Sequence, residues 1–161
     1  MPKPAATTDV QTLLVNIQRD YPDVAFIVGE HFSWHPDKRQ ISFQALNNSE
    51  YGKWALLHEV GHALLYHDHY DYDIELLQLE VAAWDKARDL AGTYETHIDE
   101  DYIQDCLDTY RDWLHMRATC PKCLTRSLQA SQCQYHCFNC ATEWRVSRSR
   151  LCRPYRLKTT G

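Results

Sequence analysis

The chain has 161 residues, of which 44% are hydrophobic and 24% charged. This length and balance predict a soluble globular domain with a modest core and a small appendage, and they exclude a wholly disordered chain. No apolar run reaches the roughly 18 residues of a membrane-spanning helix, so we expect no membrane partner. Residues 1–11 lack the apolar stretch of a secretory signal, so we expect a cytoplasmic protein. In that compartment, 7 Cys and 9 His indicate metal binding rather than disulfides.

Charge is distributed unevenly along the chain. Residues 1–116 hold 8 Lys and Arg against 21 Asp and Glu, a net charge of −13. Residues 117–161 hold 9 Lys and Arg and a single acidic residue, Glu143, a net charge of +8. Such a difference indicates two modules with different roles, so we place a domain boundary between residues 116 and 117.

Hydrophobic spacing predicts an α+β fold. Apolar residues three and four positions apart indicate helices, and short apolar runs beside turn residues indicate strands. Ser49, with the two asparagines before it, offers an N-cap for the second helix. In chain order the predicted elements are a helix at 9–19, a buried strand at 24–28, a hairpin of 33–35 and 40–43 around a turn at 36–38, a helix at 50–66, a polar loop at 67–73, helices at 74–90 and 99–114, and short strands after 117.

The predicted helix at 50–66 contains the sequence His58-Glu59-Val60-Gly61-His62. Residues four apart lie one helical turn apart on the same face, so both imidazoles can reach one zinc ion. Glu59 projects beside the metal, where its carboxylate can take a proton from the attacking water. The alternative is a core helix that carries two histidines by chance. Leucines on both sides of the motif place it in mid-helix and favour the metal site.

A catalytic zinc ion needs a third protein ligand, and two glutamates on the next helix compete for that role. Glu80 lies in the middle of the helix's apolar face, with Leu76 one turn before it and Trp84 one turn after it. An unpaired carboxylate in that position is costly, and binding to zinc removes the cost. Glu75 lies on a more solvated stripe. We therefore choose Glu80 as the third ligand.

This pattern resembles the gluzincin metallopeptidases, which carry HExxH on one helix and a glutamate on the next. The leucine-flanked motif, followed by Glu80-Val81-Ala82-Ala83-Trp84, is similar to the ImmA/IrrE-like intracellular metallo-endopeptidases over residues 9–116. The resemblance implies a small gluzincin-like metalloprotease domain that cleaves an intracellular protein. It also implies His58, His62 and Glu80 as ligands of a catalytic zinc ion, with Glu59 as the general base.

The polar loop after the motif carries His67 and His69 among three tyrosines. One of these side chains could stabilise the oxyanion of a tetrahedral intermediate. The alternative, a solvated surface loop, is the more common role for any single residue of this kind. None of them is therefore included in the predicted site.

Two CxxC pairs separated by 13 residues lie in the basic module: Cys120 with Cys123, and Cys137 with Cys140. Four thiolates at this spacing predict a closed tetrahedral zinc site inside a four-cysteine zinc ribbon. Cys133 and His136 are nearby alternatives as ligands, but only the paired pattern uses two identical knuckles. With the first site, this predicts two zinc ions per chain, one catalytic and one structural.

Arginines follow the second Cys pair, and aromatic residues are interleaved with them. Cationic groups beside aromatic faces suit phosphate contact and base stacking, which favours DNA or RNA as a partner. The alternative is a structural cap with a solvated basic tail. The candidate nucleic-acid-binding residues are Arg145, Arg148, Arg150 and Arg153, and the aromatic residues are Tyr135, Phe138, Trp144 and Tyr155.

The order of the two modules is also similar to that of SprT-type proteases, which act on DNA-bound proteins. Their third ligand is expected to be a His followed by Gly, whereas His97 here is followed by Ile98. The ligand set therefore argues against membership in that group.

The sequence as a whole predicts a zinc-dependent metallo-endopeptidase whose substrate is an intracellular protein, either a regulator or a nucleic-acid-bound protein. The hairpin at 33–43 offers an edge strand for an extended substrate. The alternative is a zinc-ribbon adaptor that binds nucleic acid or protein and carries an inactive protease-like domain. Glu59 argues against the adaptor, because a structural metal site has no need of a general base.

Overall fold

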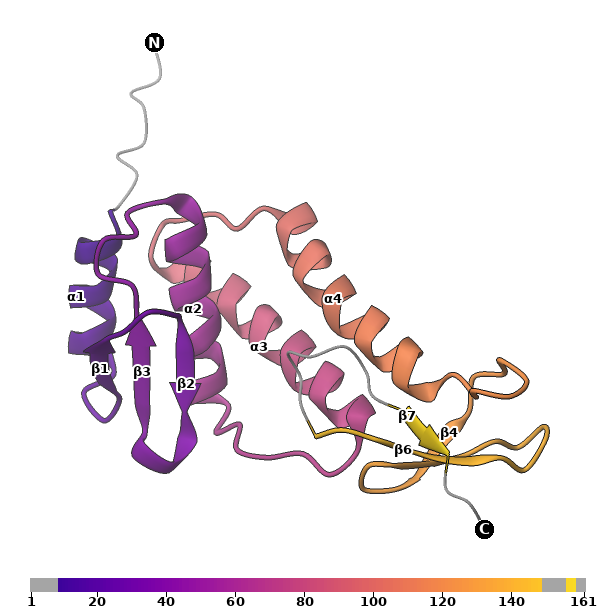
Figure 1. The fold of residues 1–161 in the computed structure, drawn as a ribbon. Coiled ribbons are helices and arrows are strands. Elements are labelled where there is room, and N and C mark those ends of the chain that lie inside the picture. Colours follow the sequence, from indigo (N-terminus) through magenta and orange to yellow (C-terminus); the bar gives the residue numbers. More distant parts are fainter. Residues whose placement is uncertain (1–8, 149–155, 159–161) are drawn as a thin grey trace. The chain divides into compact units, whose positions relative to one another are not determined.

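Four helices and two sheets make up the described part of the chain, residues 9–148 and 156–158 (Figure 1). This architecture, taken from a computed structural model, confirms the predicted α+β class. The chain divides into two compact units: residues 9–68 with 79–103, and residues 69–78 with 104–148 and 156–158. The domain boundary at residue 117 stays a prediction, because this division does not test whether 117–161 folds by itself. No helix among the described residues is long and apolar enough to cross a membrane.

The first unit contains a three-stranded sheet, one helix that precedes the sheet in the sequence and helices that follow it. Its strands have the order β1-β3-β2, with β1 parallel and β2 antiparallel to β3. The predicted hairpin is therefore confirmed. The elements are α1 (Val10–Asp20), β1 (Ala25–Val28), β2 (Ser33–His35), the 3-10 helix η1 (Pro36–Lys38), β3 (Gln40–Phe43), α2 (Glu50–Leu64), the part of α3 (Asp73–Thr93) from residue 79 onward, and the start of α4 (Glu100–Ala118).

Helix caps explain where these helices begin. The Asp9 carboxylate accepts a hydrogen bond from the Thr12 N–H at the start of α1, at 2.6 Å. The Ser49 hydroxyl accepts one from the Gly52 N–H at the start of α2, at 3.1 Å. Each bond satisfies one of the backbone donors that the first turn of a helix leaves unpaired. Apolar side chains of α1, β3 and α2 are buried in the core of this unit. They include Leu13, Ile17, Ile41, Leu56 and Leu57.

Strand β1 is more exposed than the sequence predicts. Val24, just before it, is buried, but Ile27 is 42% exposed and Val28 67% exposed. The prediction of a buried strand is therefore wrong. An apolar run does not show whether a strand lies in the middle or at the edge of a sheet. Here β1 is an edge strand, and β3 is its only partner among the described strands.

The second unit contains an antiparallel sheet, which confirms the short strands predicted after residue 117. Its strand order is β4-β5-β6-β7. Its core includes Tyr135 and Trp144, whose rings stack with centroids 5.4 Å apart. The strands are β4 (Leu128–Ser131), β5 (Gln134–His136), β6 (Glu143–Val146) and β7 (Arg156–Lys158), and the unit also holds the start of α3 and most of α4.

A buried ion pair lies within the second unit. The Arg117 guanidinium donates to both carboxylate oxygens of Asp73, at 2.7 and 3.1 Å, and the Tyr135 hydroxyl donates to the same carboxylate at 2.6 Å. Burial, together with the adjacent Asp73, raises the pKa of the Tyr135 hydroxyl. A buried charge pair is tolerated when its hydrogen-bonding groups have partners. Both Asp73 carboxylate oxygens have them, whereas Nη1 of Arg117 is buried with no partner among the described residues. The pair joins the start of α3, the end of α4 and strand β5.

Candidate metal centres

The structure brings His58 and His62 of α2 together with Glu80 of α3, and we call this group the His-His-Glu site. The two Nε2 atoms lie 3.1 Å apart. The Glu80 carboxylate lies 3.0 Å from His58 Nε2 and 3.4 Å from His62 Nε2. Glu75, the competing glutamate, belongs to the second unit, where its carboxylate accepts the N–H groups of Asp71 and Tyr72.

The chemistry and spacing of these donors fit a zinc ion. Zinc takes nitrogen and oxygen ligands at about 2.0–2.2 Å, so donors at two corners of a tetrahedron lie roughly 3.3 Å apart. The three measured separations, 3.0 to 3.4 Å, agree with that spacing. Without a metal, only one of the two facing Nε2 atoms can supply a proton to the contact between them. The site could therefore hold a metal ion.

Electrostatics favour the metal-binding form of Glu80. Burial acts to raise the pKa of its carboxyl group, but hydrogen bonds from His58 and His62 outweigh that effect, and the net pKa lies well below the ordinary value. Glu80 is thus an anion, the form in which a carboxylate binds a metal. The ring of Trp84, one turn further along α3, stacks on His58 with centroids 4.2 Å apart and covers it.

Glu59, the predicted general base, lies next to the first unit's sheet. It is half-buried, and one of its carboxylate oxygens accepts the backbone N–H of Trp34 at 2.7 Å. Trp34 lies in β2, whose only partner among the described strands is β3. The unpaired edge of β2 therefore lies beside the carboxylate of Glu59.

His67 is the residue near this site that the sequence interpretation left out. Its Nδ1 atom lies 2.8 Å from Nδ1 of His62. Burial, followed by the effect of His62, lowers the pKa of His67 to about 4, so its ring is neutral at neutral pH. One feature of the sequence points to this contact: His67 follows directly after the predicted helix at 50–66 and lies five residues after His62. His69 is not a member of the group formed by His58, His62 and Glu80.

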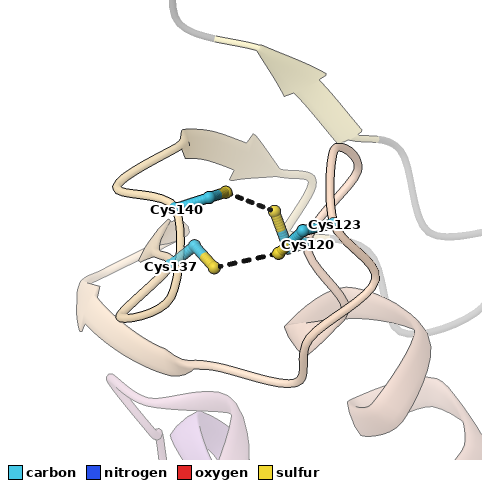
Figure 2. Close-up of side chains that lie close together, drawn as sticks. All are labelled: Cys120, Cys123, Cys137 and Cys140. Carbon is cyan, nitrogen blue, oxygen red and sulfur yellow. Dashed lines mark hydrogen bonds between the residues drawn. The ribbon is translucent and has the colours of Figure 1, made fainter.

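The four predicted cysteines also come together, in what we call the four-cysteine site (Figure 2). Sγ of Cys120 lies 3.7 Å from Sγ of Cys140, and Sγ of Cys123 lies 3.5 Å from Sγ of Cys137. Four sulfurs at about 2.3 Å from a tetrahedral zinc ion lie roughly 3.8 Å apart. The four-cysteine site could therefore hold a metal ion, and its four sulfurs would complete a tetrahedral coordination shell.

The two CxxC knuckles of the four-cysteine site each form a backbone turn of the same kind. Leu124 and Ala141, which follow the second cysteine of each pair, have φ values of 62° and 58°. Their N–H groups donate to the carbonyls of Cys120 and Cys137 at 3.0 and 2.9 Å. This repetition shows that each CxxC pair folds as the same local unit and brings its two thiols to one side.

Hydrogen bonds favour the thiolate form of Cys123. The side chains of Thr125 and Asn139 lower the pKa of Cys123 to about 5. At Cys140 the hydrogen bonds from Thr142 act to lower the pKa, but contacts with Cys123 and Cys120 contribute to a net rise in that pKa. Thiolate is the form that binds zinc, and such outer contacts orient the ligands. The two alternatives, Cys133 and His136, are not part of the group, and His136 instead lies 3.4 Å from the Glu143 carboxylate.

The predicted nucleic-acid residues are only partly described. Arg145 and Arg148 are exposed, whereas Arg150 and Arg153 lie outside the described residues, as does Tyr155.

Two of the aromatic residues do not have the predicted exposure. Tyr135 and Trp144 are buried, and the Trp144 indole donates to the Arg117 carbonyl at 2.8 Å, so their expected role in base stacking is wrong. They lie on the inward face of the second sheet, which a list of aromatic residues cannot show. Phe138, by contrast, is 74% exposed. DNA or RNA as a partner stays a prediction that depends on charge and on Phe138.

These observations define an α+β protein with two groups of side chains that could each hold a metal ion. Comparison of the chain with protein-family models, with curated proteins and with solved structures gives no significant match. Its resemblance to gluzincins therefore depends on the motif and on the residues described above.

Proposed function

We propose that this chain is a zinc-dependent metallo-endopeptidase of the gluzincin type, similar to the ImmA/IrrE-like enzymes. The observation that carries the proposal is the convergence of three donors, from His58, His62 and Glu80, with a glutamate immediately after the first histidine. A site that only stabilises the fold has no need of that glutamate. We further propose a structural zinc ion in the four-cysteine site, which would hold the C-terminal zinc ribbon together.

In the proposed mechanism, His58, His62 and Glu80 hold the catalytic zinc ion. When bound, the ion polarises the scissile carbonyl and makes water more acidic. Glu59 accepts a proton from the attacking water at its carboxylate and passes it to the leaving amine. The Trp34 N–H fixes one oxygen of that carboxylate, so β2 helps to set the direction of the base.

The same strand supplies the proposed substrate contact. An extended peptide can add to an unpaired strand edge through main-chain hydrogen bonds. The Trp34 N–H already donates to Glu59, so a peptide added to the outer edge of β2 would pair through other main-chain groups of this strand and would run close to the general base. We therefore propose an extended segment of a protein as the substrate.

The experiment that tests this function replaces Glu59 with Gln, which keeps the size of the side chain and removes the base. We expect the zinc content to stay at the wild-type level and cleavage of a degenerate peptide library to fall about 100- to 10,000-fold. Peptide products are measured by mass spectrometry and zinc by elemental analysis. Glu30→Gln, at an exposed glutamate of the same unit, is the matched control and should cleave normally.

Two outcomes contradict the proposal. Cleavage by Glu59→Gln at the wild-type rate excludes Glu59 as the base. A wild-type protein that binds zinc in the His-His-Glu site and cleaves no peptide favours the adaptor alternative.

A further inference from the structure

The chain turns back on itself immediately after α2. Tyr66 has a left-handed backbone, with φ 55°. Its N–H donates to the Ala63 carbonyl at 3.3 Å, and the N–H of His67 donates to the His62 carbonyl at 3.1 Å. These two bonds define a Schellman turn, in which the residue after the left-handed position packs against the residue five positions earlier. The two residues that this turn brings together are His67 and His62.

The side chains of these residues meet through one pair of nitrogens. Nδ1 of His62 lies 2.8 Å from Nδ1 of His67. The other ring nitrogen of His62, Nε2, faces His58 and Glu80. If Nε2 offers its lone pair to a metal, the proton of the neutral ring must lie on Nδ1, and His67 Nδ1 is then the acceptor.

The other ligand histidine has no equivalent contact. Nδ1 of His58 is buried and lacks a hydrogen-bond partner among the described residues. Of the two histidines, His62 is therefore the one whose Nδ1 faces a side-chain partner that can fix its tautomer.

His67 is itself held by a residue of the sheet. The Trp34 indole N–H donates to the His67 carbonyl at 2.8 Å. The backbone N–H of Trp34 donates to Glu59 at 2.7 Å. A single residue of β2 thus holds both the predicted base and the histidine behind His62.

We propose that His67 is a positioning residue of the His-His-Glu site: its Nδ1 accepts the Nδ1–H of His62 and keeps the Nε2 lone pair directed toward His58 and Glu80. The inference rests on the metal site of the proposed function but not on peptide hydrolysis. Removing an outer-shell partner of this kind typically weakens metal binding about 10- to 100-fold.

The test compares two substitutions of similar size in the full chain. His67→Leu removes the acceptor, whereas His67→Asn keeps one, because the Asn oxygen is attached at the same position as Nδ1 of His. We expect His67→Leu to weaken Zn²⁺ binding at the His-His-Glu site about 10- to 100-fold and His67→Asn to stay close to the wild type. Affinity is measured by competition with a chromophoric chelator, and the four-cysteine site serves as the internal control.

Zinc affinity in His67→Leu equal to that of the wild type overturns the inference. Equal losses in His67→Leu and His67→Asn also overturn it, because the ring would then act by packing alone. Should His67→Leu fail to fold, His67→Gln replaces it, since its acceptor lies one bond too far from the backbone, and we expect weaker binding than in His67→Asn. If the wild type cleaves no peptide but His67→Leu binds zinc more weakly than the wild type and His67→Asn do, the result contradicts the proposed function and supports the inference.

Discussion

The two glutamates that compete as third ligand differ in what their carboxylates contact. Glu80 is buried within 3.4 Å of both ligand histidines. Glu75 is half-buried, and its carboxylate accepts two backbone N–H groups in the turn that precedes α3, at 2.8 and 3.0 Å. One carboxylate is therefore available to a metal together with two imidazoles, and the other stabilises a turn.

This difference predicts that two alanine substitutions have different effects on zinc affinity at the His-His-Glu site. Glu80→Ala removes a ligand, so zinc affinity should fall by more than the roughly 10- to 100-fold typical of outer-shell changes. Glu75→Ala should leave that affinity unchanged. Elemental analysis and chelator competition measure both. Zinc retained in Glu80→Ala but lost in Glu75→Ala would show the opposite assignment, and zinc retained in both would direct the search to His97.

At the scale of secondary-structure elements, the contact of α2 with α3 explains the glycine of the motif. Gly61 lies inside α2, in its last turn, and glycine within a helix costs up to roughly 1 kcal/mol relative to alanine. A Cβ atom at this position would lie 2.5 Å from the Ala83 carbonyl oxygen of α3. Gly61 lies one residue before His62, and Ala83 lies three residues after Glu80. The absence of a side chain therefore lets the two helices bring their ligands together.

Gly61→Ala should push α2 and α3 apart, because the new methyl group meets backbone atoms that cannot rotate away. We expect a loss of about 1–3 kcal/mol in the free energy of unfolding and weaker zinc binding at the His-His-Glu site. Gly92→Ala is the matched control: a Cβ there meets nothing within 4 Å, so the better helix propensity of alanine should slightly stabilise the protein. Thermal unfolding and chelator competition measure the two effects. Wild-type affinity and stability in Gly61→Ala would refute the packing argument.

At the scale of the whole molecule, two candidate metal sites of different construction lie in different units. The His-His-Glu site offers three protein donors, which leaves one position of a tetrahedral zinc ion for water or substrate. The four-cysteine site offers four and is closed. Its cysteines also belong to the knuckles and core of the second sheet, so loss of a metal ion bound there would be coupled to unfolding.

We therefore expect two zinc ions per chain that a chelator removes at different rates. Elemental analysis of protein purified without chelator should find both. On addition of a chromophoric chelator, the His-His-Glu site should release its zinc first and the four-cysteine site later. One metal ion or none per chain would contradict the prediction, as would faster release from the four-cysteine site.

Much of both candidate sites could be predicted from the sequence, because their ligands are related by local geometry. The helical repeat alone places His58 and His62 on one face, and each CxxC pair folds within a single turn. Glu80 is distant in sequence, but its apolar surroundings on the predicted helix indicated burial with a partner. The approximate bounds of the four helices followed from apolar periodicity for the same reason.

Only the tertiary structure decided which side chains of distant elements meet and which faces they cover. Strand order made β1 an exposed edge, and the inward face of the second sheet buried Tyr135 and Trp144. The approach of α3 to Gly61 and the contact of Trp34 with Glu59 join elements far apart in the chain. Local periodicity fixes the direction of a side chain relative to its own helix or strand, but its neighbours depend on how those elements pack.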